Sequence, residues 1–154
     1  MKLSKKSDYA LRALVELALR HGKGPVSIRA LAQNNDVPQG FLQQIMLELK
    51  EQGWVTSLPG RDGGYLLALE PEKITMGQVV RHIDGVLAPV GCVSITHYEA
   101  CTQEAACRFR RVLLEVRNFT ARLMDQTSLA ALAAGAPATN EEVFSQEFIG
   151  GAGI

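Results

Sequence analysis

The feature that most constrains the fold of this chain is the order of short segments between residues 27 and 69. Residues 27–34 have the pattern of a short helix, and a polar break at 34–36 separates it from a second helix at 39–52. Two strand-like runs follow at 54–58 and 65–69, on either side of a glycine-rich turn. This order predicts a winged helix-turn-helix.

Further helices are expected on both sides of this unit. Residues 3–20 carry apolar side chains at helical spacing, with Ser4 or Ser7 as the N-cap. Residues 75–85 have Thr75 as an N-cap and end at Gly85. The sequence therefore predicts a mainly α fold in which the hairpin is the only β structure.

One face of the second short helix is a candidate for reading bases. Phe41, Leu42, Ile45, Met46 and Leu49 form its apolar stripe, and the opposite face is polar. Glutamine can pair bidentately with adenine, and an arginine at a hairpin tip can enter a narrow minor groove. A solvated surface would give the same pattern, but the order of helix, turn, helix and wing favours DNA contact. The predicted contact residues are Ser27, Arg29, Gln39, Gln43, Gln44, Lys50 and Arg61.

Charge and hydropathy limit the other functional classes. The net charge is zero, but residues 1–65 hold nine Lys and Arg against six Asp and Glu, a balance of +3. No apolar run approaches the roughly 20 residues needed to span a bilayer, so we expect a cytoplasmic protein with no membrane partner. Nucleophile motifs and phosphate-binding glycine loops are missing from the sequence, so we do not expect an enzyme.

Three cysteines, Cys92, Cys101 and Cys107, cluster between the helix at 75–85 and a longer helical segment. An odd number of cysteines argues against a disulfide framework and for a reduced compartment. Soft thiolates select zinc, copper(I) or iron-sulfur clusters, each of which takes four donors. The fourth donor is left open by the sequence.

A long helix is expected from residue 102 to about residue 132. Its apolar residues alternate in steps of three and four, as in a heptad seam, and pairing with a second copy would bury them. The predicted homodimer seam is Phe109, Val112, Val116, Phe119 and Leu123. We therefore expect a winged helix-turn-helix domain at 1–74, a cysteine loop and dimerisation helix at 75–132, and a flexible tail at 133–154. In that tail the pairs 143–144 and 148–149 could dock weakly.

These motifs together resemble the Rrf2 family of bacterial transcription regulators, which includes the IscR, NsrR, RirA and CymR types. The resemblance rests on SDYALRALVELA, PQGFLQQIMLELKEQGWV, PGRDGGYLL and the three-cysteine loop, and it covers about residues 1–132. It implies a homodimeric regulator that binds an operator in double-stranded DNA. In many members the cysteine loop holds an iron-sulfur cluster, of the 2Fe-2S or 4Fe-4S type.

The resemblance also implies ligands for such a cluster. Cys92, Cys101 and Cys107 match the family's cysteines, and Asp8 matches the acidic residue with which the NsrR type reaches the cluster of the other subunit. Two features depart from the IscR type: eight residues separate Cys92 from Cys101, and Arg110 stands where that type has a histidine. The expected function is regulation of DNA affinity by a cluster that senses nitric oxide, redox state or the supply of iron.

Two alternatives retain the winged helix-turn-helix as the DNA-binding unit, called the DNA reader below, and assign a different role to the cysteine loop. His97 lies inside the cysteine loop, so it could complete a structural Cys3His zinc site. The cysteines could instead form a thiol switch in a regulator of sulfur or cysteine metabolism that has no cluster.

Overall fold

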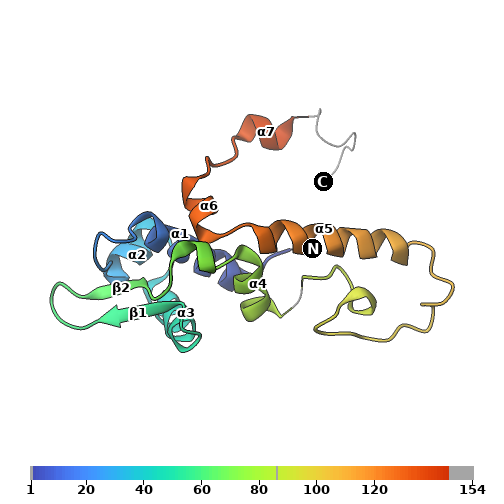
Figure 1. Ribbon diagram of the computed structural model, residues 1–154, viewed down its shortest axis with the longest axis horizontal. Coiled ribbons are helices and arrows are strands. Elements are labelled where there is room, and N and C mark those ends of the chain that lie inside the picture. Colours follow the sequence, from blue (N-terminus) through green and yellow to red (C-terminus); the bar gives the residue numbers. More distant parts are fainter. Residues whose placement is uncertain (1, 86, 146–154) are drawn as a thin grey trace.

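The computed structural model describes residues 2–85 and 87–145 of the 154-residue chain. Its amino-terminal part contains helices α1 (Lys5–Leu19), α2 (Ile28–Asn34) and α3 (Gln39–Glu51), followed by strands β1 (Val55–Leu58) and β2 (Gly64–Leu67). The two strands form an antiparallel hairpin beside α3, at one end of an elongated molecule (Figure 1). The predicted winged helix-turn-helix and the mainly α fold class are confirmed.

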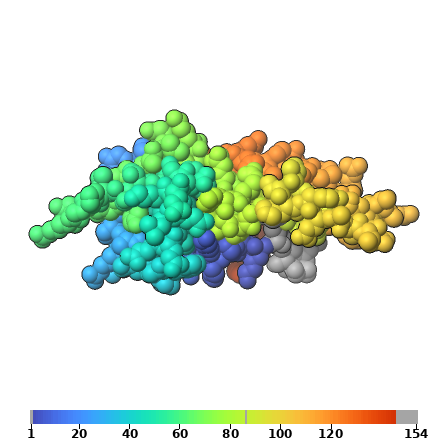
Figure 2. All heavy atoms as spheres, turned by 90° about the horizontal axis from the view of Figure 1, so that it is seen from below, coloured from blue at the N-terminus to red at the C-terminus, as the bar shows by residue number. Residues whose placement is uncertain are grey.

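The remaining elements extend away from the wing. They are the 3-10 turn η1 (Pro71–Lys73), α4 (Met76–Asp84), the 3-10 turn η2 (Gly91–Val93), α5 (Arg110–Gln126), α6 (Leu129–Ala134) and α7 (Asn140–Phe144). The cysteine loop lies at the end of the molecule opposite the wing (Figures 1 and 2). None of the helices among the described residues is long and apolar enough to cross a bilayer.

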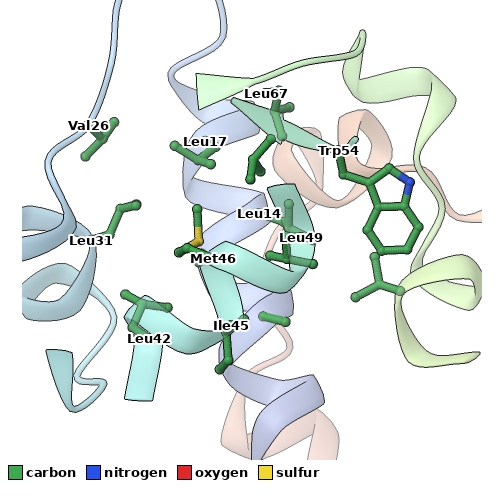
Figure 3. Close-up of a cluster of buried hydrophobic side chains, with 14 of the residues drawn as sticks. Leu14, Leu17, Val26, Leu31, Leu42, Ile45, Met46, Leu49, Trp54 and Leu67 are labelled. Atoms are coloured by element: carbon green, nitrogen blue, oxygen red, sulfur yellow. The ribbon is translucent and has the colours of Figure 1, made fainter. Parts of the chain in front are cut away.

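The core explains why the helix-turn-helix is rigid. Leu14 of α1, Leu31 of α2 and Leu42 of α3 are fully buried and converge with Met46 and Leu49 (Figure 3). Truncating one such leucine to alanine costs about 2–5 kcal/mol, a large share of a domain's stability.

The same core continues beyond the hairpin into the second half of the chain. Ile74, Val79 of α4 and Leu129 of α6 belong to the buried cluster. The packing is therefore continuous across residue 74, and the division of roles predicted there stays a prediction.

Local sequence signals fix the helix ends. The side chains of Ser4, Ser27 and Thr75 each accept a backbone N–H in the first turn of α1, α2 and α4. Gly85 ends α4 at φ 77°, a left-handed conformation that glycine adopts without strain. Each of these positions follows the sequence prediction.

The hairpin is fastened to the segment before α2. Val26 and Tyr65 exchange two backbone hydrogen bonds of 2.8 Å each. At Gly64, where φ is 153°, a Cβ atom would overlap the backbone of Val26. The wing therefore moves with the start of α2 as one unit.

The predicted long helix at 102–132 is wrong in its bounds. Helix α5 covers only Arg110–Gln126, and a new helix begins after Ser128. The break has a tertiary cause: the N–H of Met76 donates to Thr127 (2.9 Å) and the N–H of Leu129 donates to Ile74 (2.8 Å). Pairing with the segment before α4 thus replaces the helical hydrogen bonds at Thr127.

The tail predicted at residues 133–154 includes the end of α6 and the whole of α7. Helix α6 ends at Ala134 and packs on α1, and α7 is capped by Thr139. Val143 and Phe144 are exposed, and the 148–149 pair lies outside the described residues.

Candidate cysteine centre and DNA-contacting surface

All three cysteines line one hollow between the loop and the start of α5. Its volume is about 580 Å³, and Cys101 is exposed whereas Cys92 and Cys107 are half-buried. The described residues hold no ready-made group of three His, Cys, Asp or Glu side chains spaced to bind a metal. The three thiols fit the donor chemistry of an iron-sulfur cluster, but the loop must draw in further to bring them onto one centre.

Arg110 fastens the two ends of this loop. Its Nε and Nη2 donate to the carbonyl oxygen of Cys92 at 3.2 and 2.8 Å, and Nη2 lies 3.3 Å from a carboxylate oxygen of Glu104. Arg110 therefore holds the end of the loop at Cys92 against the start of α5.

Glu104 joins the middle of the loop to the same network. It accepts the backbone N–H of Cys101 at 3.0 Å and the hydroxyl of Tyr98 at 2.8 Å. The bond from Cys101, and then that from Tyr98, lowers the pKa of Glu104 below its usual range. The bond to Glu104 raises the pKa of Tyr98 in turn. Glu104 is thus anionic and Tyr98 a neutral donor around neutral pH.

His97 lies apart from the sulfur hollow. Its side chain packs against the end of α4, where a Cβ on Gly85 would be 3.0 Å from the ring. Its Nδ1 lies 3.3 Å from the hydroxyl of Thr96. This placement does not favour His97 as the fourth ligand, so the zinc alternative has no geometric support here.

Asp8 is held by its own helix. The guanidinium of Arg12 donates to both carboxylate oxygens, at 2.9 and 3.0 Å, and also to the carbonyl of Asn35 at 3.2 Å. Asp8 is not among the residues that line the cysteine hollow of the same chain. If Asp8 is a ligand, it must therefore serve the partner subunit's loop.

The predicted DNA-contacting residues lie on α2, α3 and the wing. Arg29, Gln39, Gln43, Gln44 and Arg61 are all exposed.

Two residues of this set have contacts within the protein. The hydroxyl oxygen of Ser27 accepts the N–H of Ala30 and so caps α2, which leaves its proton able to donate to DNA. The ammonium group of Lys50 donates to the hydroxyl of Ser57 at 2.7 Å. Lys50 is therefore tied to the wing rather than free. The role of all seven residues stays a prediction.

The seam residues of α5 are unburied in the single chain. Their exposed fractions run from 40% for Val116 to 69% for Phe109, and none of the described side chains of α5 is fully buried. Phe109 lies just before the helix rather than inside it. A row of large exposed apolar side chains marks an interaction surface. The members are Phe109, Val112, Val116, Phe119 and Leu123.

The fold and the loop define a winged helix-turn-helix protein with a cysteine centre beyond its recognition unit. Residues 3–135 match the Rrf2 family, described as "Iron-dependent Transcriptional regulator". The chain belongs to this family, whose members are DNA-binding transcription regulators.

Relatives and solved structures agree with this assignment. The chain is 40% identical over 143 residues to an rrf2-like protein of Rhodobacter capsulatus, covering 88% of this chain and 95% of that protein. It is 35% identical to the regulator CymR of Bacillus subtilis (86% and 90% covered) and 32% identical to the regulator NsrR of Geobacillus kaustophilus (86% and 89%).

Solved structures that share the fold include two named regulators. The structure of CymR, the global cysteine regulator of B. subtilis, superposes with a TM-score of 0.76 at 34% identity, covering 87% of this chain and 97% of that one. IscR of T. potens gives 0.68 at 26% identity, covering 90% and 94%.

Sequence reasoning missed two residues, Arg12 beside Asp8 and Tyr98 in the loop, and it missed the hydrogen bonds that Glu104 accepts. The spacing of Asp8 and Arg12, four residues apart on a helix, is a signal that could have predicted their ion pair. The bonds from Glu104 to Tyr98 and Cys101 depend on the loop conformation, which no periodic pattern encodes.

Proposed function

We propose that this protein is a homodimeric transcription regulator whose affinity for an operator depends on an iron-sulfur cluster held by Cys92, Cys101 and Cys107, with Asp8 of the partner subunit as the fourth ligand. The observation that carries this proposal is that all three cysteines of the chain line one hollow, which Arg110 and Glu104 fasten from both sides. When bound, the cluster supplies a redox-active and nitric-oxide-reactive iron site.

The DNA reader and the seam support the dimeric part of the proposal. Exposed glutamines on α3 and Arg61 on the wing face outward from one rigid core. Pairing of two α5 seams would place two such readers in one particle, as operators with two half-sites require.

The link between the centre and the reader runs through Arg12. One end of its guanidinium binds Asp8, and the other binds the carbonyl of Asn35 in the turn between α2 and α3. If Asp8 is engaged by the partner's cysteine loop, Arg12 loses its carboxylate partner. Asp8 would thus be either paired with Arg12 or bound to the cluster. The change between these two states would shift the conformation of the turn that positions the recognition helix α3.

Single substitutions of the three cysteines by alanine test the ligand set. We expect each variant to lose its iron to the same extent after purification without oxygen. Thr102→Ala is the matched control, because Thr102 is exposed in the same loop and does not line the hollow. Full iron in any one cysteine variant would contradict a shared centre.

Replacing Asp8 by alanine tests the fourth ligand and the coupling together. Operator binding should become insensitive to the state of the cluster, whereas Arg12→Ala should retain iron but weaken the coupling. If Asp8→Ala keeps the sensitivity of the unchanged protein, the proposed route from the centre to the reader is wrong.

A thiol switch is a second candidate function, favoured by the exposure of Cys101. The similarity to CymR, named a global cysteine regulator, points to the same possibility, and CymR of Staphylococcus aureus has been solved in an oxidised form. In this case hydrogen peroxide would oxidise two of the three thiols to a disulfide, and the two protons and two electrons that they lose would reduce the peroxide to two molecules of water. Regulation that survives loss of one cysteine would favour this function over the cluster.

A further inference from the structure

A second hollow, of about 530 Å³, lies between α5 and the segment that follows α4. It shares no lining residue with the cysteine hollow. We call it the arginine hollow. Its polar lining includes Arg81, Ser94, Arg117, Asn118, Arg122 and Asp125.

The charge in this hollow is unbalanced. Of the three arginines, Arg81 is paired with Asp125. No salt bridge within the described part of the chain joins Arg117 or Arg122 to an acid. The hollow therefore keeps two positive charges without a counter-ion from the protein.

Arg117 carries an unsatisfied donor. Its Nη2 donates to the side-chain oxygen of Asn118 at 2.7 Å, but its Nε–H is buried and has no acceptor among the described residues. A buried donor without a partner is costly. A small turn of the guanidinium toward an anion in the hollow would remove that cost.

Ser94 adds a buried hydroxyl to the same lining. It is only 6% exposed, and its oxygen accepts the N–H of His97 at 3.0 Å, which leaves the hydroxyl proton free to donate. Leu87 and Ala121 supply an apolar wall beside these donors. The lining thus combines cationic and neutral donors with a short apolar surface.

We propose that the arginine hollow binds a small organic anion, a carboxylate or a phosphate ester with a short apolar part. Arg117 and Arg122 would hold the anionic group, and Ser94 would add a hydrogen bond. This claim does not rest on the iron-sulfur proposal.

The hollow would remain open in a dimer. At about 100° per residue of helix, Arg117, Ala121 and Asp125 lie on the face of α5 opposite the seam residues Val116 and Phe119. A partner that covers the seam would therefore leave Arg117 uncovered, whereas Arg122, three residues after Phe119, borders the seam.

A ligand here would act on the joint between α4 and α5. Arg81 belongs to α4, which packs on α1, whereas Asp125 belongs to the helix that carries the seam. An anion that draws Arg81 away from Asp125 would loosen this ion pair. A ligand at this site could thus change the orientation of the winged helix-turn-helix relative to the α5 seam.

Binding can be measured on the full-length protein labelled with nitrogen-15. Sodium phosphate and sodium succinate are titrated separately at constant ionic strength, and the arginine Nε–H resonances are followed. We expect saturable shifts of the resonance that disappears in Arg117→Gln. Saturation by phosphate alone would identify a phosphate ligand, and saturation by succinate alone a carboxylate ligand; either outcome supports the site.

Substitutions sharpen the test. Arg117→Gln and Arg122→Gln should each weaken binding about tenfold, since each removes a charged hydrogen-bond donor. Asp125→Asn should strengthen binding severalfold because it removes the internal competitor for Arg81. Arg122 is exposed, so its variant remains informative if Arg117→Gln disturbs the fold.

Matched controls on the same helix separate a site from general charge effects. Arg111→Gln and Glu115→Gln remove exposed charges that do not line the hollow, and should change the affinity less than twofold. If neither anion gives a saturable shift, or if Arg111→Gln weakens binding as much as Arg122→Gln, the proposal is overturned.

Discussion

Removing the side chain of Arg110 should open the cysteine loop while leaving the winged helix-turn-helix intact. The short hydrogen bond of 2.8 Å to the carbonyl of Cys92 involves a charged donor, and such bonds contribute about 1.5–3 kcal/mol. The second bond, at 3.2 Å, and the partly exposed ion pair with Glu104 add little. We therefore expect Arg110→Ala to destabilise the closed loop by about 2 kcal/mol, which corresponds to about 30-fold more frequent opening.

Thiol modification of metal-free protein measures this opening. Cys92 and Cys107 are half-buried, so their reaction with a disulfide reagent should become about 30-fold faster in Arg110→Ala. Cys101 is exposed in the intact loop and serves as an internal reference whose rate should change little.

Arg111→Ala is the control, because Arg111 is the exposed neighbour on the same helix and does not line the cysteine hollow. If Cys92 and Cys107 react at unchanged rates in Arg110→Ala, or equally fast in the control, Arg110 does not fasten the loop.

Four further predictions concern the rest of the molecule. Gly77→Ala would push a Cβ into Asp125, so it should lower the unfolding free energy by about 1–3 kcal/mol in denaturant titrations. Phe119→Glu should turn dimers into monomers in sedimentation experiments, because it places a charge in the seam; an unchanged mass would refute the seam. Arg61→Ala should weaken operator binding and reduce the slope of log K against log salt by about 1 in titrations at several salt concentrations if it binds phosphate. Burial alone would raise the pKa of Asp84, but hydrogen bonds from the amino end of α1 lower it below its ordinary 3.8. The stability lost in Asp84→Asn should therefore be largest above pH 4 and vanish as the pH falls through the lowered pKa, as thermal melts across pH can show.

The first half of the fold follows directly from local signals in the sequence. Ser27 and Thr75 cap helices where their positions predict, and the glycine-rich turn at 59–64 joins two strands. These elements obey short-range rules of capping, periodicity and turn chemistry.

The end of α5 has one local signal, since Ser128 caps α6 by accepting the N–H of Ala131, but a serine alone does not end a helix. Residues 127 and 128 have no helix-breaking glycine or proline, and they leave the helix because they pair with residues 74–76, about 50 positions earlier. Long-range backbone pairing of this kind overrides local propensity.

The candidate site was predictable in its residue types but only partly in its contacts. The clustering of the cysteines pointed to the centre, and Asp8 was singled out through the family resemblance. Arg110 and Cys92 are 18 positions apart in the sequence, with an irregular loop between them, and the bond from Arg12 to Asn35 joins α1 to the turn after α2. Neither contact has a periodic signature.

The central claim is that the three thiols of one chain, together with Asp8 of the partner subunit, hold an iron-sulfur cluster. An absorption spectrum with iron and sulfide counts on protein purified without oxygen tests it most directly. The account predicts a brown protein with a visible sulfur-to-iron band and matching iron and sulfide. Colourless protein that carries one zinc per chain, or no metal at all, would contradict it.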